Sequence, residues 1–195
     1  MPRGLKTGLA LAAIVALAIV AAWVIIPPDR GPSGSAAIGG SFTLTDQHGR
    51  TFTSAALHGK LGLIYFGYTY CPDICPTELQ TISAALDRLG KSADQVVPVF
   101  ITVDPARDTP AVLARYLEDF SPRLIGLTGT PDQIAAVARA YRVYYAKAAS
   151  SGGADDYMMD HSNIIYLMGR DGRYLTHFSL QSTPDQIAAA IRAHL

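Results

Sequence analysis

The chain has 195 residues, 49% of them hydrophobic, and its 16 basic and 16 acidic side chains give a formal net charge of zero. This length accommodates one domain with a substantial core and an extra segment at one end. The basic residues form no stripe, so the sequence gives no indication of a nucleic-acid-binding protein.

The N-terminal region contains 18 consecutive apolar residues, from Leu9 to Ile26, preceded by Arg3 and Lys6. This run is long enough for a short membrane-spanning helix. It is also longer than the apolar core of a signal peptide, which usually has about 7–15 residues. A cleaved signal remains the competing interpretation, but the pattern favours an uncleaved membrane anchor over residues 1–26. The basic flank predicts that the N-terminus stays in the cytoplasm or matrix and that the rest of the chain is exported.

Residues 27–40 are mostly Pro, Gly, Ser and Ala and contain one large apolar side chain, Ile38. Such a composition predicts a flexible linker, because it cannot bury a core. The folded, exported domain is therefore expected to span residues 41–195.

The first half of this domain shows strand patterns followed by a helix pattern. An alternating segment over 41–46, a turn signal and a second segment over 51–53 predict a hairpin. The apolar and aromatic run over 61–70 predicts a buried strand. Apolar residues at steps of three and four predict a helix over 77–89.

A second buried strand is predicted for 96–103, where Pro98 indicates that the strand is paired on one side only at that point. The pair Thr109-Pro110 then predicts the start of a helix that continues to Phe120, with threonine as the cap and proline in the first turn.

The string Thr-Pro-Asp-Gln-Ile-Ala-Ala occurs at 130–136 and again at 183–189. Its threonine-to-glutamine spacing fits a capping box, so each copy predicts a helix start. Between the two copies, strands over 164–168 and 174–178 flank a strong turn signal and predict a second hairpin. The order of elements predicts an α/β thioredoxin-like sandwich with an N-terminal hairpin, preceded by a single transmembrane helix.

The only two cysteines, Cys71 and Cys75, follow the first buried strand, where sites commonly occur in open α/β sheets. Each precedes a proline, and a residue before proline is disfavoured in a helix, so we expect a stiff turn with the helix beginning at Pro76. The nearby helix N-terminus favours a thiolate. A structural disulfide, a redox pair and a metal-ligating pair all remain open on this spacing.

Among the five histidines, His161 differs from the rest, because it lies in a polar loop directly before the strand over 164–168. In a thioredoxin-like fold this loop would face the helix that carries the cysteines. Two sulfurs and an imidazole suit Cu(I), and imidazole also suits Cu(II), so copper is favoured over zinc. The remaining histidines are expected at the surface or in packing positions; these are His48, His58, His177 and His194.

Four separated motifs resemble the Sco/SenC (PrrC) family, in the order in which that family has them. They are Tyr65-Phe66-Gly67-Tyr68-Thr69 leading to Cys71-Pro72-Asp73-Ile74-Cys75-Pro76, Ile101-Thr102-Val103-Asp104-Pro105 with Arg107-Asp108-Thr109-Pro110, Gly126-Leu127-Thr128-Gly129-Thr130, and Asp160-His161-Ser162 with Tyr166-Leu167-Met168.

The resemblance implies a membrane-tethered, thioredoxin-like copper chaperone that helps to assemble the CuA site of cytochrome c oxidase. It implies that Cys71, Cys75 and His161 are the copper ligands. The implied partners are subunit II of cytochrome c oxidase and another copper chaperone. The implied location is the inner membrane, with a single span and the C-terminal domain in the periplasm or its intermembrane equivalent.

Two further expectations concern residues beside the histidine. Asp160 is a candidate partner for the other ring N–H of His161, where it would orient the imidazole or tune the site, with a solvated loop charge as the alternative. The pair Met158 and Met159 offers thioethers to Cu(I), but burial is the favoured explanation for both.

The main alternative function is a thiol-disulfide oxidoreductase in which Cys71 and Cys75 reduce the CuA-site cysteines, since that chemistry needs no histidine. The three-residue spacer, and the lack of a proline between Asp155 and Asn163, both favour metal binding over enzymatic activity.

Overall fold

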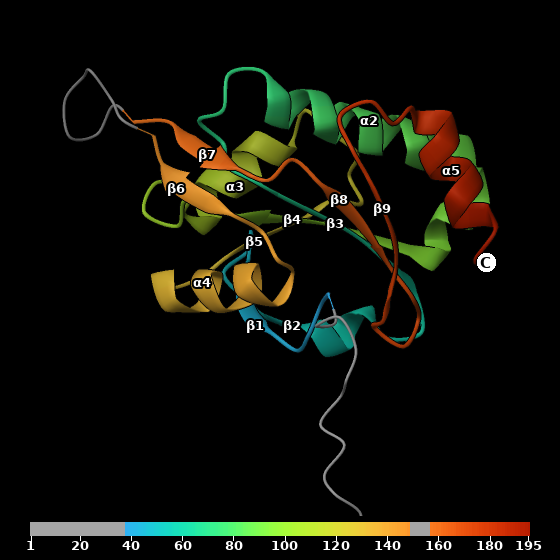
Figure 1. Ribbon diagram of the computed structural model, residues 1–195, viewed down its shortest axis with the longest axis horizontal. Helices are drawn as coiled ribbons and strands as arrows, with labels where there is room; N and C mark the ends of the chain where they lie inside the picture. Colours follow the sequence, from blue (N-terminus) through green and yellow to red (C-terminus); the bar gives the residue numbers. More distant parts are fainter. Residues whose placement is uncertain (1–37, 149–156) are drawn as a thin grey trace, which may run out of the picture. The chain divides into compact units, whose positions relative to one another are not determined.

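A mixed sheet forms the centre of the fold in the computed structural model, which describes residues 38–148 and 157–195 (Figure 1). The strands are β1 (Thr43–Asp46), β2 (Thr51–Thr53), β3 (Leu61–Gly67), β4 (Val96–Thr102), β5 (Ile125–Thr128), β8 (Ile165–Met168) and β9 (Tyr174–Phe178). They lie in the order β2-β1-β5-β4-β3-β8-β9. A separate two-stranded sheet pairs β6 (Tyr145–Lys147) with β7 (Met159–His161).

The predicted membrane anchor, 1–26, and the predicted linker up to residue 37 lie outside the described residues. Within the described ranges, no helix has the length and apolarity needed to cross a membrane.

Helices cover both faces of the main sheet. They are α2 (Ile74–Leu89), α3 (Pro110–Leu117), α4 (Pro131–Ala140) and α5 (Pro184–Arg192), with short 3-10 helices at Ser54–Leu57 and Gly90–Gln95. Figure 1 shows α2 and α5 side by side on one face and α4 on the opposite face. Because successive side chains of a strand point to opposite faces, Tyr65 contacts α2 through Cys75, while its neighbour Phe66 packs against Tyr141 at the end of α4.

Strand β3 is an interior strand of the sheet, between β4 and β8. All seven of its residues are buried, and it pairs in parallel with β4 and antiparallel with β8. This explains its continuous apolar sequence, because a strand covered on both faces needs no polar alternation. The predicted one-sided pairing at Pro98 is confirmed: Pro98 lies opposite Leu63 of β3, whereas β4 pairs with β5 only from Val99 onward.

The predicted helix starts after threonine are confirmed. The Thr130 and Thr183 side chains each accept a hydrogen bond from the backbone N–H of a glutamine three residues later. The side-chain oxygen of that glutamine in turn accepts a hydrogen bond from the backbone N–H of the threonine. The Thr109 side chain accepts from the N–H of Val112 at the start of α3. These caps satisfy donors that the first turn of a helix leaves unpaired.

The expected start of α2 at Pro76 is wrong, since the helix begins at Ile74 and already contains Cys75. Pro76 is tolerated because the first turn of a helix has no acceptor for its missing N–H. The prediction of a polar loop around residue 161 is also wrong, since Met159–His161 forms strand β7. Three strands, β5, β6 and β7, were not expected, because each has only three or four residues and too little alternation to be recognised.

Candidate metal centre

The sheet topology brings the cysteines and His161 together at the carboxyl end of strand β3. Strand β8 runs antiparallel to β3 and begins opposite the end of β3, with Ile165 facing Tyr65. Both cysteines follow β3, and His161 precedes β8, so all three residues emerge at that end. The sequence-based expectation that the histidine faces the cysteine helix agrees with this arrangement.

A direct contact joins the Cys75 sulfur and the Nε2 atom of His161, which are 3.4 Å apart. Cys75 is fully buried and Cys71 is half-buried, and both thiols are free. The Cys71 sulfur accepts a hydrogen bond from the backbone N–H of Cys75 at 3.4 Å. Tyr65 donates its hydroxyl proton to the Cys75 sulfur at 3.7 Å, so the buried thiol is fixed from the sheet side.

The ring of His161 is oriented with Nε2 toward the sulfurs. Its Nδ1 atom lies 3.1 Å from the carbonyl oxygen of Ser162. Because a carbonyl can only accept, Nδ1 carries the proton and Nε2 presents a lone pair. The rings of Tyr65 and Tyr68 contact the imidazole edge-on at centroid distances of 6.3 and 5.8 Å.

The two cysteines differ in acidity. The hydrogen bond from the Cys75 thiol, the neighbouring His161 side chain and backbone N–H groups together lower the pKa of Cys71 to about 3, against the effect of burial. The hydrogen bond from the Cys75 thiol to the Cys71 sulfur, together with burial, raises the pKa of Cys75. The reduced site therefore holds one thiolate, on the accessible sulfur, and one protonated thiol in the interior.

The donor set fits a soft metal ion. Tetrahedral bonds of about 2.0 Å to nitrogen and about 2.3 Å to sulfur place those two donors roughly 3.5 Å apart, close to the observed sulfur–nitrogen contact. Among residues 38–148 and 157–195, no group of three or more His, Cys, Asp or Glu side chains is arranged to hold a metal ion. The fit therefore rests on the donor types and on the sulfur–nitrogen distance.

A cavity of about 390 Å³ opens at this site. It exposes Cys71 and His161 to ligands from outside, whereas the fully buried Cys75 does not line it. The lining residues are Tyr68, Cys71, Pro72, Asp73, Ile74, Tyr144, Met158, Met159, Asp160, His161 and Asn163.

Asp160 lines the cavity but is exposed to solvent. The partner that fixes the second ring nitrogen of His161 is the Ser162 carbonyl, so the orienting role expected for Asp160 belongs in this structure to the main chain. The methionine pair also departs from the expectation of joint burial. Met159 is 8% exposed, whereas Met158 is 39% exposed at the cavity mouth.

A buried carboxylate that sequence reasoning did not single out holds the cysteine loop. Asp108 is fully buried and accepts hydrogen bonds from the backbone N–H and hydroxyl of Thr69, at 3.0 and 2.6 Å, and from the Thr102 hydroxyl at 2.5 Å. Burial raises its pKa, while these donors act against the increase. Asp108 therefore connects the end of β4 with the turn that leads to Cys71.

Arg107 connects the cysteine side of the site with the strand that carries the histidine. Its guanidinium pairs with Asp104, donates to the Tyr157 carbonyl at 2.9 Å and lies over the rings of Tyr70 and Tyr157. The Tyr157 hydroxyl donates to Asp104 at 2.8 Å, which closes the network. The motif around Arg107 contributed to the family resemblance, but its spacing gave no indication of this bridging role.

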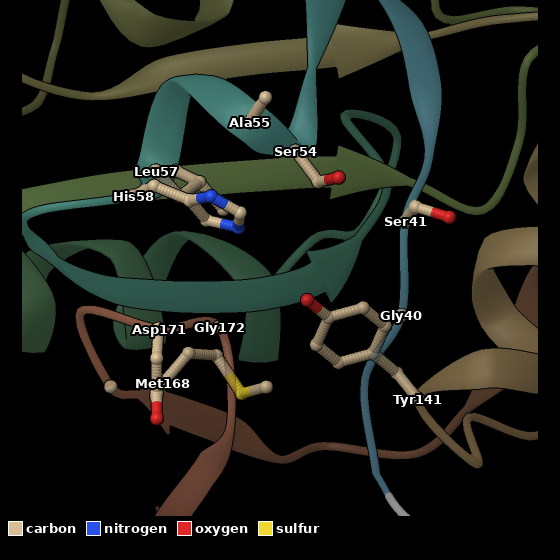
Figure 2. Close-up of a pocket in the computed structure, with 11 residues that line it drawn as sticks. Gly40, Ser41, Ser54, Ala55, Leu57, His58, Tyr141, Met168, Asp171 and Gly172 are labelled. Carbon is tan, nitrogen blue, oxygen red and sulfur yellow. The ribbon is translucent and has the colours of Figure 1, made fainter.

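Another cavity, of about 300 Å³, lies at the opposite end of β8 from the cysteines (Figure 2). Figure 2 shows the His58 ring, the Tyr141 hydroxyl and the Met168 thioether around the hollow. Neither cysteine nor His161 lines it, so Met168 is a methionine remote from the candidate metal centre.

Glu78, one turn after Cys75 on α2, gives a pH-dependent prediction. It is 4% exposed, and burial raises its pKa from 4.5 to about 6. The folded protein therefore holds this proton more tightly than the unfolded chain, so stability falls as pH rises between those two values. The buried Tyr65 phenol, which faces Glu78, stays neutral throughout. Glu78→Gln is expected to raise the free energy of unfolding by about 1 kcal/mol at neutral pH and to change it little near pH 4.

Urea unfolding at both pH values checks this expectation, with the exposed Glu118→Gln as control. An equal effect of Glu78→Gln at both values would contradict it.

The fold and the site together define a thioredoxin-like α/β domain with a dithiol–imidazole centre at the carboxyl end of its central strand. The SCO1/SenC family model matches residues 30–195, and the chain belongs to this family. The membership expected from the four motifs is thereby confirmed.

Similar proteins agree with this assignment. The chain is 46% identical over 157 residues to a SCO2-like protein of Rickettsia felis, covering 80% of this chain and 77% of that one. Copper-bound ScoI of Bradyrhizobium japonicum is 52% identical, with a TM-score of 0.76 over 82% of this chain and 100% of that chain. Copper-bound yeast Sco1 is 41% identical, with a TM-score of 0.75 over 81% of this chain and 88% of that chain.

Proposed function

We propose that this protein is a membrane-tethered copper metallochaperone that delivers copper to the CuA site of cytochrome c oxidase or prepares that site. The observation that carries the proposal is the 3.4 Å contact between the Cys75 sulfur and Nε2 of His161, beside the half-exposed Cys71. The copper bound to two similar proteins supports the choice of metal.

Copper is the cargo, and each of the three side chains has a distinct part in handling it. The Cys71 thiolate is accessible and meets the incoming Cu(I) first. Cys75 then loses its proton to solvent and supplies the second thiolate, and His161 adds a neutral nitrogen without any proton change. A chaperone must also release its metal, which suits a site whose Cys71 and His161 side chains line an open cavity.

The cellular setting belongs to the same proposal. Residues 1–26 anchor the chain in the inner membrane as a single span, residues 27–40 form the linker, and residues 41–195 form the domain on the periplasmic or equivalent intermembrane side. Copper comes from another copper chaperone and passes to subunit II of cytochrome c oxidase.

His161→Ala is expected to lower the Cu(I) affinity of the reduced full-length protein about 10- to 100-fold, since it removes the only nitrogen donor of the set. Competition with a coloured Cu(I) chelator measures the affinity. His177→Ala is the matched control, because His177 lies on the exposed surface of β9, in contact with Tyr174. Equal affinities for His161→Ala and the wild type would overturn the proposed ligand set.

The asymmetric cysteine pair supports a second candidate, a thiol-disulfide oxidoreductase. The Cys71 thiolate would attack a disulfide in the recipient's copper site, form a mixed disulfide and release one thiol. Cys75 would then attack Cys71, which leaves the chain oxidised and the recipient with two thiols, a transfer of two electrons.

Single-turnover reaction of the reduced protein with an oxidised CuA-site peptide separates the two candidates. Reduction at equal rates by the wild type and His161→Ala would support the second candidate. No reduction by either protein would exclude it.

A further inference from the structure

The two adjacent methionines of the site have different environments. Met159 faces the interior, whereas Met158 is 39% exposed at the mouth of the cavity that contains Cys71 and His161. Burial therefore accounts for Met159 but leaves the position of Met158 unexplained.

The side chain of Tyr68 contacts both Met158 and His161 of the candidate metal centre. Tyr68 is 2% exposed and donates its hydroxyl proton to the Met158 sulfur at 3.9 Å. Tyr68 also lines the cavity that Cys71, Met158 and His161 line. The ring of Tyr68 also contacts His161, with ring centroids 5.8 Å apart. The thioether therefore lies at the mouth of the same cavity that Cys71 and His161 line, in contact with the tyrosine that packs against the imidazole.

The chemistry of a thioether matches this position. Thioether sulfur is a soft ligand that suits Cu(I), and it is neutral at every pH, so it binds without releasing a proton. The Met side chain has three rotatable bonds and can reach either inward or toward a docked protein.

We propose that Met158 is an entry and exit ligand for Cu(I), an inference that rests on the proposed chaperone function. During exit, a lone pair of the Met158 sulfur forms a bond to copper as the bond between copper and Nε2 of His161 breaks. The metal stays Cu(I), the imidazole keeps its own lone pair, and no proton or electron is transferred. Entry follows the same step in reverse.

The test measures how fast copper leaves the protein. The reduced full-length chain is loaded with one equivalent of Cu(I) and mixed with excess bicinchoninate in a stopped-flow instrument. Met158→Leu, which keeps the size but removes the sulfur, is expected to slow transfer roughly tenfold while the equilibrium affinity changes less than about twofold. Met168→Leu is the matched control, because the same change is made in the cavity remote from the cysteines.

Trapping the intermediate gives a readout independent of rate. In selenomethionine-labelled His161→Ala loaded with Cu(I), the vacated position is expected to be taken by residue 158. Selenium-edge X-ray absorption should then show a copper neighbour that disappears when Met158→Leu is added.

Transfer by Met158→Leu at the wild-type rate would overturn the inference, as would equal slowing by Met168→Leu or the lack of a copper–selenium signal. These outcomes leave the proposed function intact as long as the wild type binds copper. A wild-type protein that binds no Cu(I) would instead contradict the proposed chaperone function.

Discussion

Cys75→Ser is expected to lower the Cu(I) affinity of the reduced protein by at least about a hundredfold. Serine keeps the shape of the side chain, but its hydroxyl stays protonated at neutral pH and is a hard donor, whereas Cu(I) prefers thiolate. The loss is large because Cys75 is fully buried against His161, so no other group of the cavity can replace its sulfur at that point. Chelator competition measures the affinity.

Cys71→Ser is expected to cause a loss of similar size. It should also make the Cys75 thiol easier to ionise, because the hydrogen bond to the Cys71 sulfur is the largest cause of the raised pKa of Cys75. Far-UV circular dichroism of both variants should match that of the wild type, which excludes unfolding as the reason for lost binding. A Cys75→Ser protein with nearly wild-type affinity would contradict the ligand assignment.

Asp108→Ala is expected to destabilise the protein by about 3 kcal/mol, the largest stability effect that the site predicts. The substitution leaves the Thr69 N–H, the Thr69 hydroxyl and the Thr102 hydroxyl without their acceptor, and the space around Asp108 is fully buried. Asp108→Asn keeps one acceptor oxygen and should lose about half as much. Urea unfolding of the full-length chain gives both values.

Asp119→Ala is the matched control, because Asp119 is exposed just after helix α3. This substitution should change the free energy of unfolding by less than about 0.5 kcal/mol. Equal stabilities for Asp108→Ala and Asp119→Ala would show that the Thr69 turn does not depend on the carboxylate. Since that turn leads directly to Cys71, Asp108→Ala is also expected to weaken copper binding even where the protein remains folded.

The parts of the fold with strong local signals could be predicted from the sequence. The continuous apolar run of β3 and the two capping boxes have local causes, namely burial on both faces and satisfaction of free N–H groups. Strands β5 and β7 could not be predicted, because three or four residues are held in extended form by their neighbours rather than by their own pattern.

The same distinction applies to the site. The approach of His161 to the cysteines followed from strand order, since β8 begins where β3 ends. The roles of Asp108 and Arg107 depend on contacts between loops that are far apart in the chain, and no spacing rule indicates them. The sequence also could not separate Met158 from Met159, because only Met159, the first residue of the short strand β7, turns its side chain into the interior.

Copper-edge X-ray absorption of the reduced full-length protein with one equivalent of Cu(I) identifies the atoms bound to the metal. We expect two sulfur neighbours and one nitrogen neighbour in the wild type, and loss of the nitrogen in His161→Ala. Identical spectra for the two proteins, or a copper ion bound without sulfur, would contradict this expectation.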